Sequence, residues 1–300
     1  PADSPFAAST LYTANIALTA KIGWTLDGVA ANSFTVMGST TTNVMNSGTI
    51  LAVFPTTGSG IKPSDYSSVS IGTLKGIPDG TFSRDGIAGN DSTVSAFRMS
   101  QYEITRTQYL AIMGTDPSDT TRSTGMTDPV QNLTWYDAIE FCNKLSVKEG
   151  LTEVYTLSNR FPSTGYPIIA ATVTVSDWNA SGYRLPTEME WMWAAMGATS
   201  DGRSGDIVDG VNIGGYTKPF AGSTGSNEIK DYVWYYFNVY EHKSQPVGGK
   251  LPNELDLYDM SGNIAEFIWD CHGPYPTGVV NNYRGNDDPL QSDPVIRGLS

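Results

Sequence analysis

Basic residues are scarce in this sequence. Its 300 residues include 18 Lys and Arg against 31 Asp and Glu, which gives a formal net charge of −13 at pH 7. Nucleic acids, and anionic membrane surfaces likewise, are bound through clustered Lys and Arg side chains, and the sequence has no such cluster. We therefore expect no nucleic-acid partner and no anionic membrane surface, and we interpret the acidity as a contribution to solubility.

Histidine and cysteine are scarcer still. His242 and His272 are too few for a typical zinc site or a nucleophile and base pair, and each is expected in a loop. Cys142 and Cys271 are too few for a disulfide-stapled scaffold. Cys142 falls on an apolar helical stripe, which favours a small core residue. Cys271 falls in a predicted loop and is either free or bridged to Cys142.

Long apolar runs are missing as well. No run approaches the roughly 18 residues that cross a bilayer, so we expect no transmembrane segment. The opening residues Pro1–Pro5 lack the charged start and apolar stretch of a signal peptide. This start is typical of a mature or trimmed product.

What the sequence does contain changes in character near residue 74. Residues 1–73 are rich in Ser, Thr, Gly and Ala, with short apolar runs at Phe34–Met37 and Ile50–Phe54 between turn-forming stretches. That pattern predicts strands. We expect residues 1–73 to form either a small β domain or strands laid against a main domain that spans residues 74–300.

Three capping boxes predict three helices in the main domain. Each has a Thr three residues before a side chain that can reach back to its amide, although Asp137 is a shorter substitute for the usual Glu or Gln. The pairs are Thr105 with Gln108, Thr134 with Asp137, and Thr187 with Glu190. The helices should end near Gly114, Gly150 and Gly197, because glycine suits the left-handed position after a helix.

The spacing of apolar residues predicts the buried faces of these helices. In the first helix, we expect Tyr109, Leu110 and Met113 to point inward. The second has the clearest stripe, with the i, i+3, i+4, i+7 set Ala138, Phe141, Cys142 and Leu145. Between the second and third helices, Ile168–Val175 predicts a strand. Helix should be the minority structure.

Several motifs in one order carry a family resemblance. The two most specific are Gly182–Trp191, GYRLPTEMEW, and Leu257–Trp269, LYDMSGNIAEFIW. Together with Phe97–Thr105, Pro129–Ala138 and Val295–Gly298, they resemble the formylglycine-generating enzyme (sulfatase-modifying factor) family over about residues 74–300. The resemblance implies an α+β fold: a C-type lectin fold of the formylglycine-generating type, with few short helices, antiparallel strands and long ordered loops.

Two local interactions follow from the residues of these motifs. Arg184 and Glu190 lie six residues apart around a helix cap, so we expect a structural ion pair between strand and helix. Gly262 and Asn263 suit a left-handed turn, because glycine has no Cβ and Asn tolerates that conformation.

The resemblance also implies a calcium site. Members of the family bind calcium through the loop that matches residues 259–266. The matching ligands are Asp259, Gly262, Ile264 and Glu266, with Gly262 and Ile264 contributing backbone carbonyls. The alternative is a loop held by its own hydrogen bonds. A second calcium site of the family has no convincing match in Asp231–Glu241.

Catalysis depends on residues that the resemblance places near the C-terminus. Formylglycine-generating enzymes oxidise a substrate cysteine with copper held by two cysteines beyond an Arg-Gly-Gly-Ser segment. The sequence reads Arg297-Gly-Leu-Ser300 and ends there, so the domain is expected to be incomplete at its C-terminus. Neither Cys142 nor Cys271 offers the pair, and we identify no catalytic residue.

The same motifs are similar to the variable proteins of diversity-generating retroelements, in which a rigid C-type lectin scaffold displays a diversified surface. We therefore expect a non-catalytic, extracellular or cell-surface protein that binds an unknown protein or small molecule near Trp234, Tyr235 and Arg297. A lipid anchor before Pro1 is compatible with this location. One alternative is a copper-dependent formylglycine-generating oxidoreductase that acts on a cysteine of a sulfatase-type substrate. Another is a structural surface protein without a small ligand.

Overall fold

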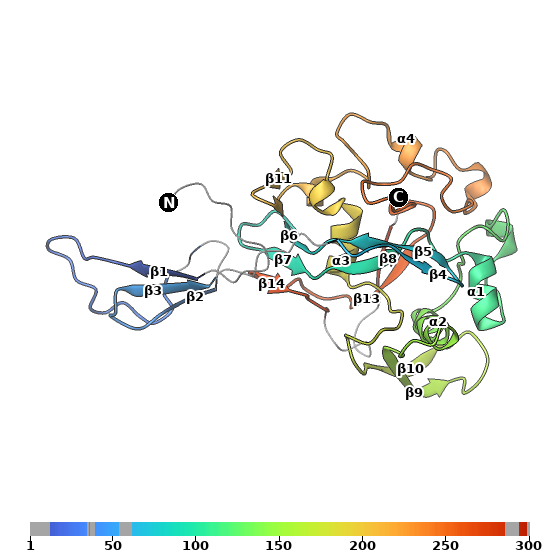
Figure 1. Cartoon of the computed structure of the whole chain (residues 1–300), viewed down its shortest axis with the longest axis horizontal. Coiled ribbons are helices and arrows are strands. Elements are labelled where there is room, and N and C mark those ends of the chain that lie inside the picture. Colours follow the sequence, from blue (N-terminus) through green and yellow to red (C-terminus); the bar gives the residue numbers. More distant parts are fainter. Residues whose placement is uncertain (1–12, 35, 37–39, 54–61, 286–293, 299–300) are drawn as a thin grey trace.

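The computed structural model describes residues 13–34, 36, 40–53, 62–285 and 294–298. Its first sheet projects from the rest of the chain (Figure 1) and consists of β1 (Thr13–Ala17), β3 (Thr49–Val53) and β2 (Thr40–Asn43), in that antiparallel order. Ile50 and Ala52 form its buried face. The predicted strand at Ile50–Phe54 is confirmed as β3. In the predicted run Phe34–Met37, the described residues Phe34 and Val36 are not part of a strand, and the other two lie outside the described residues.

The main body is built from short strands in several small sheets. β4 (Tyr66–Ser68), β5 (Gly72–Ile77) and β8 (Phe97–Ser100) form one antiparallel sheet. A mixed sheet has the order β11 (Ile207–Val208), β12 (Val211–Asn212), β6 (Gly80–Ser83), β7 (Asp91–Val94), β14 (Val280–Asn281). Two antiparallel two-stranded sheets complete it: β9 (Tyr155–Phe161) with β10 (Ala170–Val175), and β13 (Glu266–Cys271) with β15 (Pro294–Arg297).

The three predicted capping boxes are all present. They begin α1 (Arg106–Met113), α2 (Trp135–Lys148) and α3 (Glu188–Ala195), and each Thr side chain accepts a hydrogen bond from the amide three residues on. The remaining helical turns are short: α4 (Ile229–Tyr232) and the 3₁₀ turns Thr120–Arg122, Ala198–Ser200, Gly215–Thr217 and Tyr240–His242. Among the residues described, no helix is long and apolar enough to span a bilayer.

The predicted buried faces are confirmed with one exception. The stripe of α2 is buried, and Tyr109 and Met113 of α1 are buried as predicted. The prediction for Leu110 is wrong, because its side chain is 39% exposed. α1 packs on α2 through the face that carries Tyr109 and Met113. Leu110 follows Tyr109 by one residue and is therefore about 100° further around the helix, outside that face.

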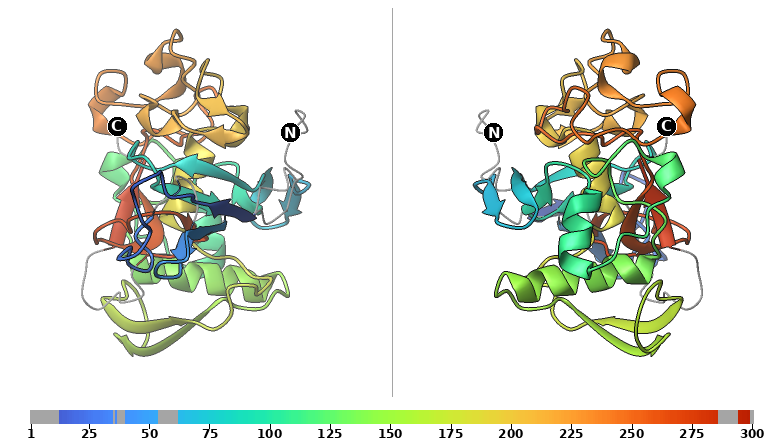
Figure 2. Two further views of the ribbon diagram at one scale, coloured as in Figure 1. Left: turned by 90° about the vertical axis from the view of Figure 1, so that its left-hand side faces the viewer. Right: turned by 90° about the vertical axis from the view of Figure 1, so that its right-hand side faces the viewer.

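The longest helix and the longest run of loops lie on opposite sides of the central strands. Figures 1 and 2 show α2 and the β9–β10 hairpin along one side of the central strands, with the extended segment from β11 to α4 on the opposite side. The buried apolar residues form three clusters: one around α3 and β5–β7, one between α2 and β10, and one between α1 and α2. The functional candidates lie where these clusters meet and in the loop before β13.

Candidate functional site

The loop that precedes β13 has the predicted left-handed turn. Gly262 has φ of 90° and Asn263 has φ of 60°. A Cβ at Gly262 would fall 2.1 Å from the carbonyl oxygen of Trp234, so only glycine fits there. Asn263 donates its backbone N–H to that same oxygen at 3.0 Å. The turn therefore fixes the segment around Trp234 against the predicted calcium loop.

Of the two predicted carboxylate ligands, Asp259 is buried and Glu266 is half-buried. Asp259 is 3% exposed; its Oδ2 accepts a hydrogen bond from the amide of Gly248 at 2.7 Å, and its Oδ1 has no hydrogen-bond partner. Glu266 Oε2 accepts a hydrogen bond from Trp191 Nε1 at 2.6 Å. A buried carboxylate oxygen without a partner costs free energy that a bound cation would recover.

Burial also shifts the acidity of these groups. It raises the pKa of Asp259, and together with the nearby charge of Asp259 it raises the pKa of Glu266 to about 7. Calcium at this loop would supply the positive charge that the two carboxylates lack. The residues therefore fit a calcium ion, with Gly262 and Ile264 beside them in the same turn. Within the described part of the chain, no three His, Cys, Asp or Glu side chains are grouped as a metal site, so backbone oxygens would have to complete the coordination.

Glu103 is a member of this site that the sequence did not identify. Its buried carboxylate accepts hydrogen bonds from Asn263 Nδ2 at 2.7 Å and from the amide of Ile264 at 3.3 Å. Burial, with the charges of Glu266 and Asp259, raises its pKa well above the usual value. Because Glu103 precedes the loop by about 160 residues, no local spacing could have signalled the contact.

The segment around Trp234 presents aromatic rings to solvent. Trp234 lies under the ammonium group of Lys250, which is 4.0 Å from the ring centre. Tyr236 is 66% exposed and Phe237 is 84% exposed, and their rings pack edge to face at 5.2 Å. Tyr235 is half-buried against Phe237. Tyr236 and Phe237 are therefore not part of the core.

Arg297, the third predicted binding residue, joins this region through its backbone. β15 pairs with β13 so that Arg297 is opposite Glu266, and the carbonyl of Gly298 accepts a hydrogen bond from the amide of Gly262 at 2.6 Å. The Arg297 side chain is engaged elsewhere: it forms an ion pair with Glu188 and donates to the Tyr275 hydroxyl. The structure thus brings the main chains of Trp234 and β15 to the same turn.

The predicted ion pair of the GYRLPTEMEW motif is present. Arg184 Nη1 and Nη2 reach the two carboxylate oxygens of Glu190 at 2.7 and 2.6 Å. Glu190 also accepts a hydrogen bond from the amide of Thr187, which closes the cap of α3. The pair therefore holds the chain before α3 to the first turn of that helix.

Neither cysteine is bridged. Cys142 is 7% exposed and Cys271 is 6% exposed, and no disulfide joins them. Burial raises the pKa of the Cys142 thiol to about 12, so it is almost entirely protonated at neutral pH. The two residues belong to different elements, α2 and the end of β13.

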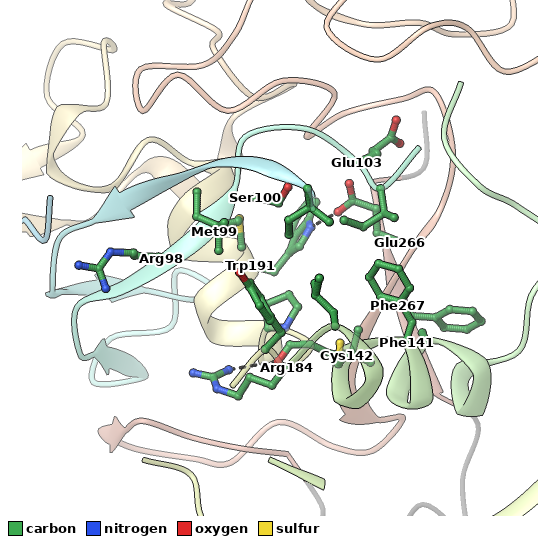
Figure 3. Close-up of a pocket in the computed structure, with 18 of the residues that line it drawn as sticks. Arg98, Met99, Ser100, Glu103, Phe141, Cys142, Arg184, Trp191, Glu266 and Phe267 are labelled. Carbon is green, nitrogen blue, oxygen red and sulfur yellow. Dashed lines mark hydrogen bonds between the residues drawn. The ribbon is translucent and has the colours of Figure 1, made fainter. Parts of the chain in front are cut away.

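A cavity of about 710 Å³ opens beside Glu266. Figure 3 shows its walls: Phe141 and Cys142 come from α2, Met99 from β8, Trp191 from α3, and Phe267 from β13. Arg184 lies along one side of it (Figure 3), and its ion-pair partner Glu190 also lines the cavity. The lining is mainly apolar and aromatic, and a space of this size is typical of small-molecule sites.

Known proteins are similar to this chain over the part that contains the site described above. The profile of the family described as "Sulfatase-modifying factor enzyme 1-like domain" matches residues 66–298. Chaperone protein LppX of Paenibacillus barcinonensis is 33% identical over an alignment of 222 residues, and the match covers 67% of this chain and 71% of that protein. Treponema denticola variable protein 1 matches with 30% identity and a TM-score of 0.60, over 79% of this chain and 88% of that one. PvdO from Pseudomonas aeruginosa, 19% identical, has the same fold with a TM-score of 0.51 over 80% of this chain and 86% of that one.

Proposed function

The chain belongs to the sulfatase-modifying factor enzyme 1-like family, and from that premise we propose that it is a non-catalytic ligand-binding protein displayed at the cell surface. The α+β fold of the C-type lectin, formylglycine-generating type, predicted from its motifs, is confirmed. The observation that carries the proposal is the similarity to a variable protein, at 30% identity over 88% of that protein.

The cysteines support binding over catalysis. Oxidation of a substrate cysteine with copper needs two thiols close together and open to the substrate. Cys142 and Cys271 are each buried and unbridged, and the Cys142 thiol has a raised pKa. Neither Cys142 nor Cys271 therefore supplies such a pair, and the copper-dependent oxidoreductase remains the alternative.

The aromatic turn at residues 234–238 supports a recognition surface. Asn238 holds it in shape by accepting a hydrogen bond from the amide of Tyr235 and donating one to the carbonyl of Val233, both at 2.8 Å. Exposed Tyr and Phe on a preorganised turn are typical of protein-recognition surfaces. We propose that the ligand contacts this turn together with the chain that follows β15, next to Trp234, Tyr235 and Arg297.

Sequencing this gene in independent isolates tests the proposal. We expect substitutions to concentrate after Val295–Gly298, at codons that arise from adenine positions in a template, because that is where a diversified surface would adjoin the aromatic turn. Residues 62–285 should stay constant, since they form the scaffold. An invariant region that carries two close cysteines would instead support the oxidoreductase.

Surface display is tested by labelling intact cells with a membrane-impermeant amine reagent. Lys230 should react before lysis, because its side chain is 61% exposed. Lys218 is the internal control: its side chain is 3% exposed and pairs with Asp201 and Glu254, so it should stay unlabelled in folded protein. Labelling of Lys230 only after lysis would contradict display.

A further inference from the structure

Lys218 is buried against two carboxylates. Its side chain is 3% exposed, and its Nζ lies 3.0 Å from Asp201 Oδ1 and 2.6 Å from Glu254 Oε1. The carbonyl of Met196 also accepts a hydrogen bond from this Nζ, at 3.0 Å. The side chain of Asp201 is 0% exposed and that of Glu254 is 16% exposed. An amine and two carboxylates therefore share a space that solvent scarcely enters.

The formal charges of these three side chains do not cancel. Lys218 supplies one positive charge against the two carboxylates of Asp201 and Glu254. The guanidinium of Arg203, close by in the chain, is paired with Asp206 at 2.6 Å. Buried charges without full compensation are costly, so a reaction that removes charge from this space is favoured.

Asp201 is held in one orientation beside the amine. Its Oδ1 also accepts a hydrogen bond from the amide of Arg203 at 3.0 Å, and its Oδ2 accepts one from Asn212 Nδ2 at 3.3 Å. Asn212 is 0% exposed and is itself fixed by donating to the carbonyl of Ala198 at 2.8 Å. Donors on both oxygens stabilise the negative charge that develops on a carboxyl group when a nucleophile adds to its carbon. Reacting groups held in contact also react much faster than the same groups free in solution.

Glu254 lies in contact with both reacting residues. Its Oε1 contacts Lys218 Nζ and also accepts a hydrogen bond from the amide of Gly202, the residue after Asp201, at 3.1 Å. Its Oε2 is buried and has no hydrogen-bond partner among the residues that the structure describes. Gly197 leaves room for this oxygen, because a Cβ there would fall 2.6 Å from it. A carboxylate in this position can act first as general base and then as general acid.

We propose that Lys218 and Asp201 condense to an isopeptide bond in the folded protein. Lys218 Nζ forms a bond to Asp201 Cγ, and one C–O bond of that carboxyl group breaks. Of the three protons on the ammonium, one stays on the amide nitrogen and two leave with the departing oxygen as water. Glu254 takes protons from Nζ and passes them to the leaving oxygen, so it ends unchanged. The reaction needs no oxidant, reductant or cofactor, and it consumes one positive and one negative charge.

The bond ties together the two ends of the segment that contains β11 and β12. Asp201 follows the 3₁₀ turn Ala198–Ser200, and Lys218 follows the turn Gly215–Thr217. The two cysteines of the chain form no disulfide, so this bond supplies a covalent cross-link that they do not. A cross-link stabilises a fold by restricting the unfolded chain. Burial also protects the new amide from hydrolysis, because water has little access to it.

Digestion of the denatured protein with trypsin tests the proposal. Trypsin cuts after Lys and Arg except before proline, so Asp201 is released in peptide 185–203. Lys218 precedes Pro219 and is released uncut within peptide 204–230. After overnight incubation of the folded protein at neutral pH, mass spectrometry should show the two as one joined peptide, lighter than their sum by one water. Two separate peptides of unchanged mass would mean an ion pair only and would overturn the proposal.

A succinimide is the product that has to be distinguished from the cross-link. Asp201 is followed by Gly202, and an Asp–Gly pair that closes to a succinimide also loses one water. In that case peptides 185–203 and 204–230 stay separate, and the mass loss falls on the first alone. This result would reject the cross-link even if the mass of the intact protein were lower than the sequence mass by one water.

Two carboxamide variants of the same loop test the proton transfer. Glu254→Gln keeps Asp201 and Lys218 but removes the group that accepts the protons, so the joined peptide should appear about a hundredfold more slowly. Asp256→Asn is the matched control: its side chain is 64% exposed, and the joined peptide should form as in the parent. An undiminished rate in Glu254→Gln would contradict the proposed reaction. If Glu254→Gln fails to fold, the digest of the parent protein decides the proposal by itself.

Discussion

Arg184→Met is expected to lower the free energy of unfolding by about 3–5 kcal/mol, because it leaves the Glu190 carboxylate buried without its partner. The side chains of Arg184 and Glu190 are 23% and 13% exposed, and two hydrogen bonds of 2.7 and 2.6 Å join them. The guanidinium also lies over the ring of Trp178, at 5.4 Å from the ring centre. Urea unfolding, followed by tryptophan fluorescence, measures the loss.

An exposed ion pair of the same chain provides the control. Lys230 and Glu228 have side chains that are 61% and 66% exposed, so Lys230→Met should not change the urea midpoint measurably. The double variant Arg184→Met, Glu190→Gln should recover part of the loss, since it removes the unpaired charge. Equal, small effects of Arg184→Met and Lys230→Met would mean that the motif pair does not stabilise the fold.

Calcium is expected to stabilise the protein, and more strongly above pH 7 than below it. Asp259 has a buried oxygen without a hydrogen-bond partner, and Glu266 has a pKa raised to about 7. At a calcium concentration 100 times the dissociation constant, the gain in unfolding free energy is about 2.7 kcal/mol. Thermal melts in calcium and in chelator at pH 5.5 and pH 8 measure it.

The sign of the pH effect follows from the two pKa values of Glu266. The usual value is 4.5 and the folded value is about 7, so between them the folded protein holds a proton that the unfolded chain has lost. Without calcium, the unfolding free energy therefore falls as pH rises from 4.5 to about 7, by about 3 kcal/mol in total. Calcium must displace that proton, so its affinity should rise with pH over the same window.

Two carboxamide variants distinguish calcium binding at the predicted loop from non-specific calcium binding elsewhere on the protein. Glu266→Gln should abolish the calcium-dependent shift in melting temperature and flatten the pH dependence of the metal-free protein. Glu241→Gln is the control: its side chain is 51% exposed, in the Asp231–Glu241 segment where no second calcium site is predicted. A calcium shift that survives in Glu266→Gln, or no shift in the parent protein, would favour a loop held by its own hydrogen bonds.

Features that depend on neighbouring residues could be predicted from the sequence. The caps at Thr105, Thr134 and Thr187 each need a partner only three residues away, and all three are present. The Arg184–Glu190 pair spans six residues and is also present. Leu110 was predicted to be buried but is exposed. The spacing of apolar residues shows which side of a helix faces the core, but it does not show how wide a face the neighbouring helix covers.

The candidate sites were predicted less completely than the fold. The loop of Asp259 and Glu266 was found through motif resemblance, but its buried neighbour Glu103 was not, since the two segments are far apart in the chain. Trp234 and Tyr235 were predicted from the sequence to lie near the ligand. Only the structure shows that they are half-buried and that the neighbouring Tyr236 and Phe237 are exposed. Their exposure depends on which segments pack beside them.

The sequence by itself determined the helix caps, the left-handed turn at Gly262 and Asn263, and the family to which the chain belongs. Each of these depends on residue types in a short stretch, where one or two hydrogen bonds or one steric requirement decide the conformation. Tertiary structure alone decided the contact of Glu103 with the loop of Asp259 and Glu266, the cavity beside Glu266 and the exposure of the aromatic turn. Those features arise from the packing of distant segments against one another, and no local pattern encodes the space that remains between them.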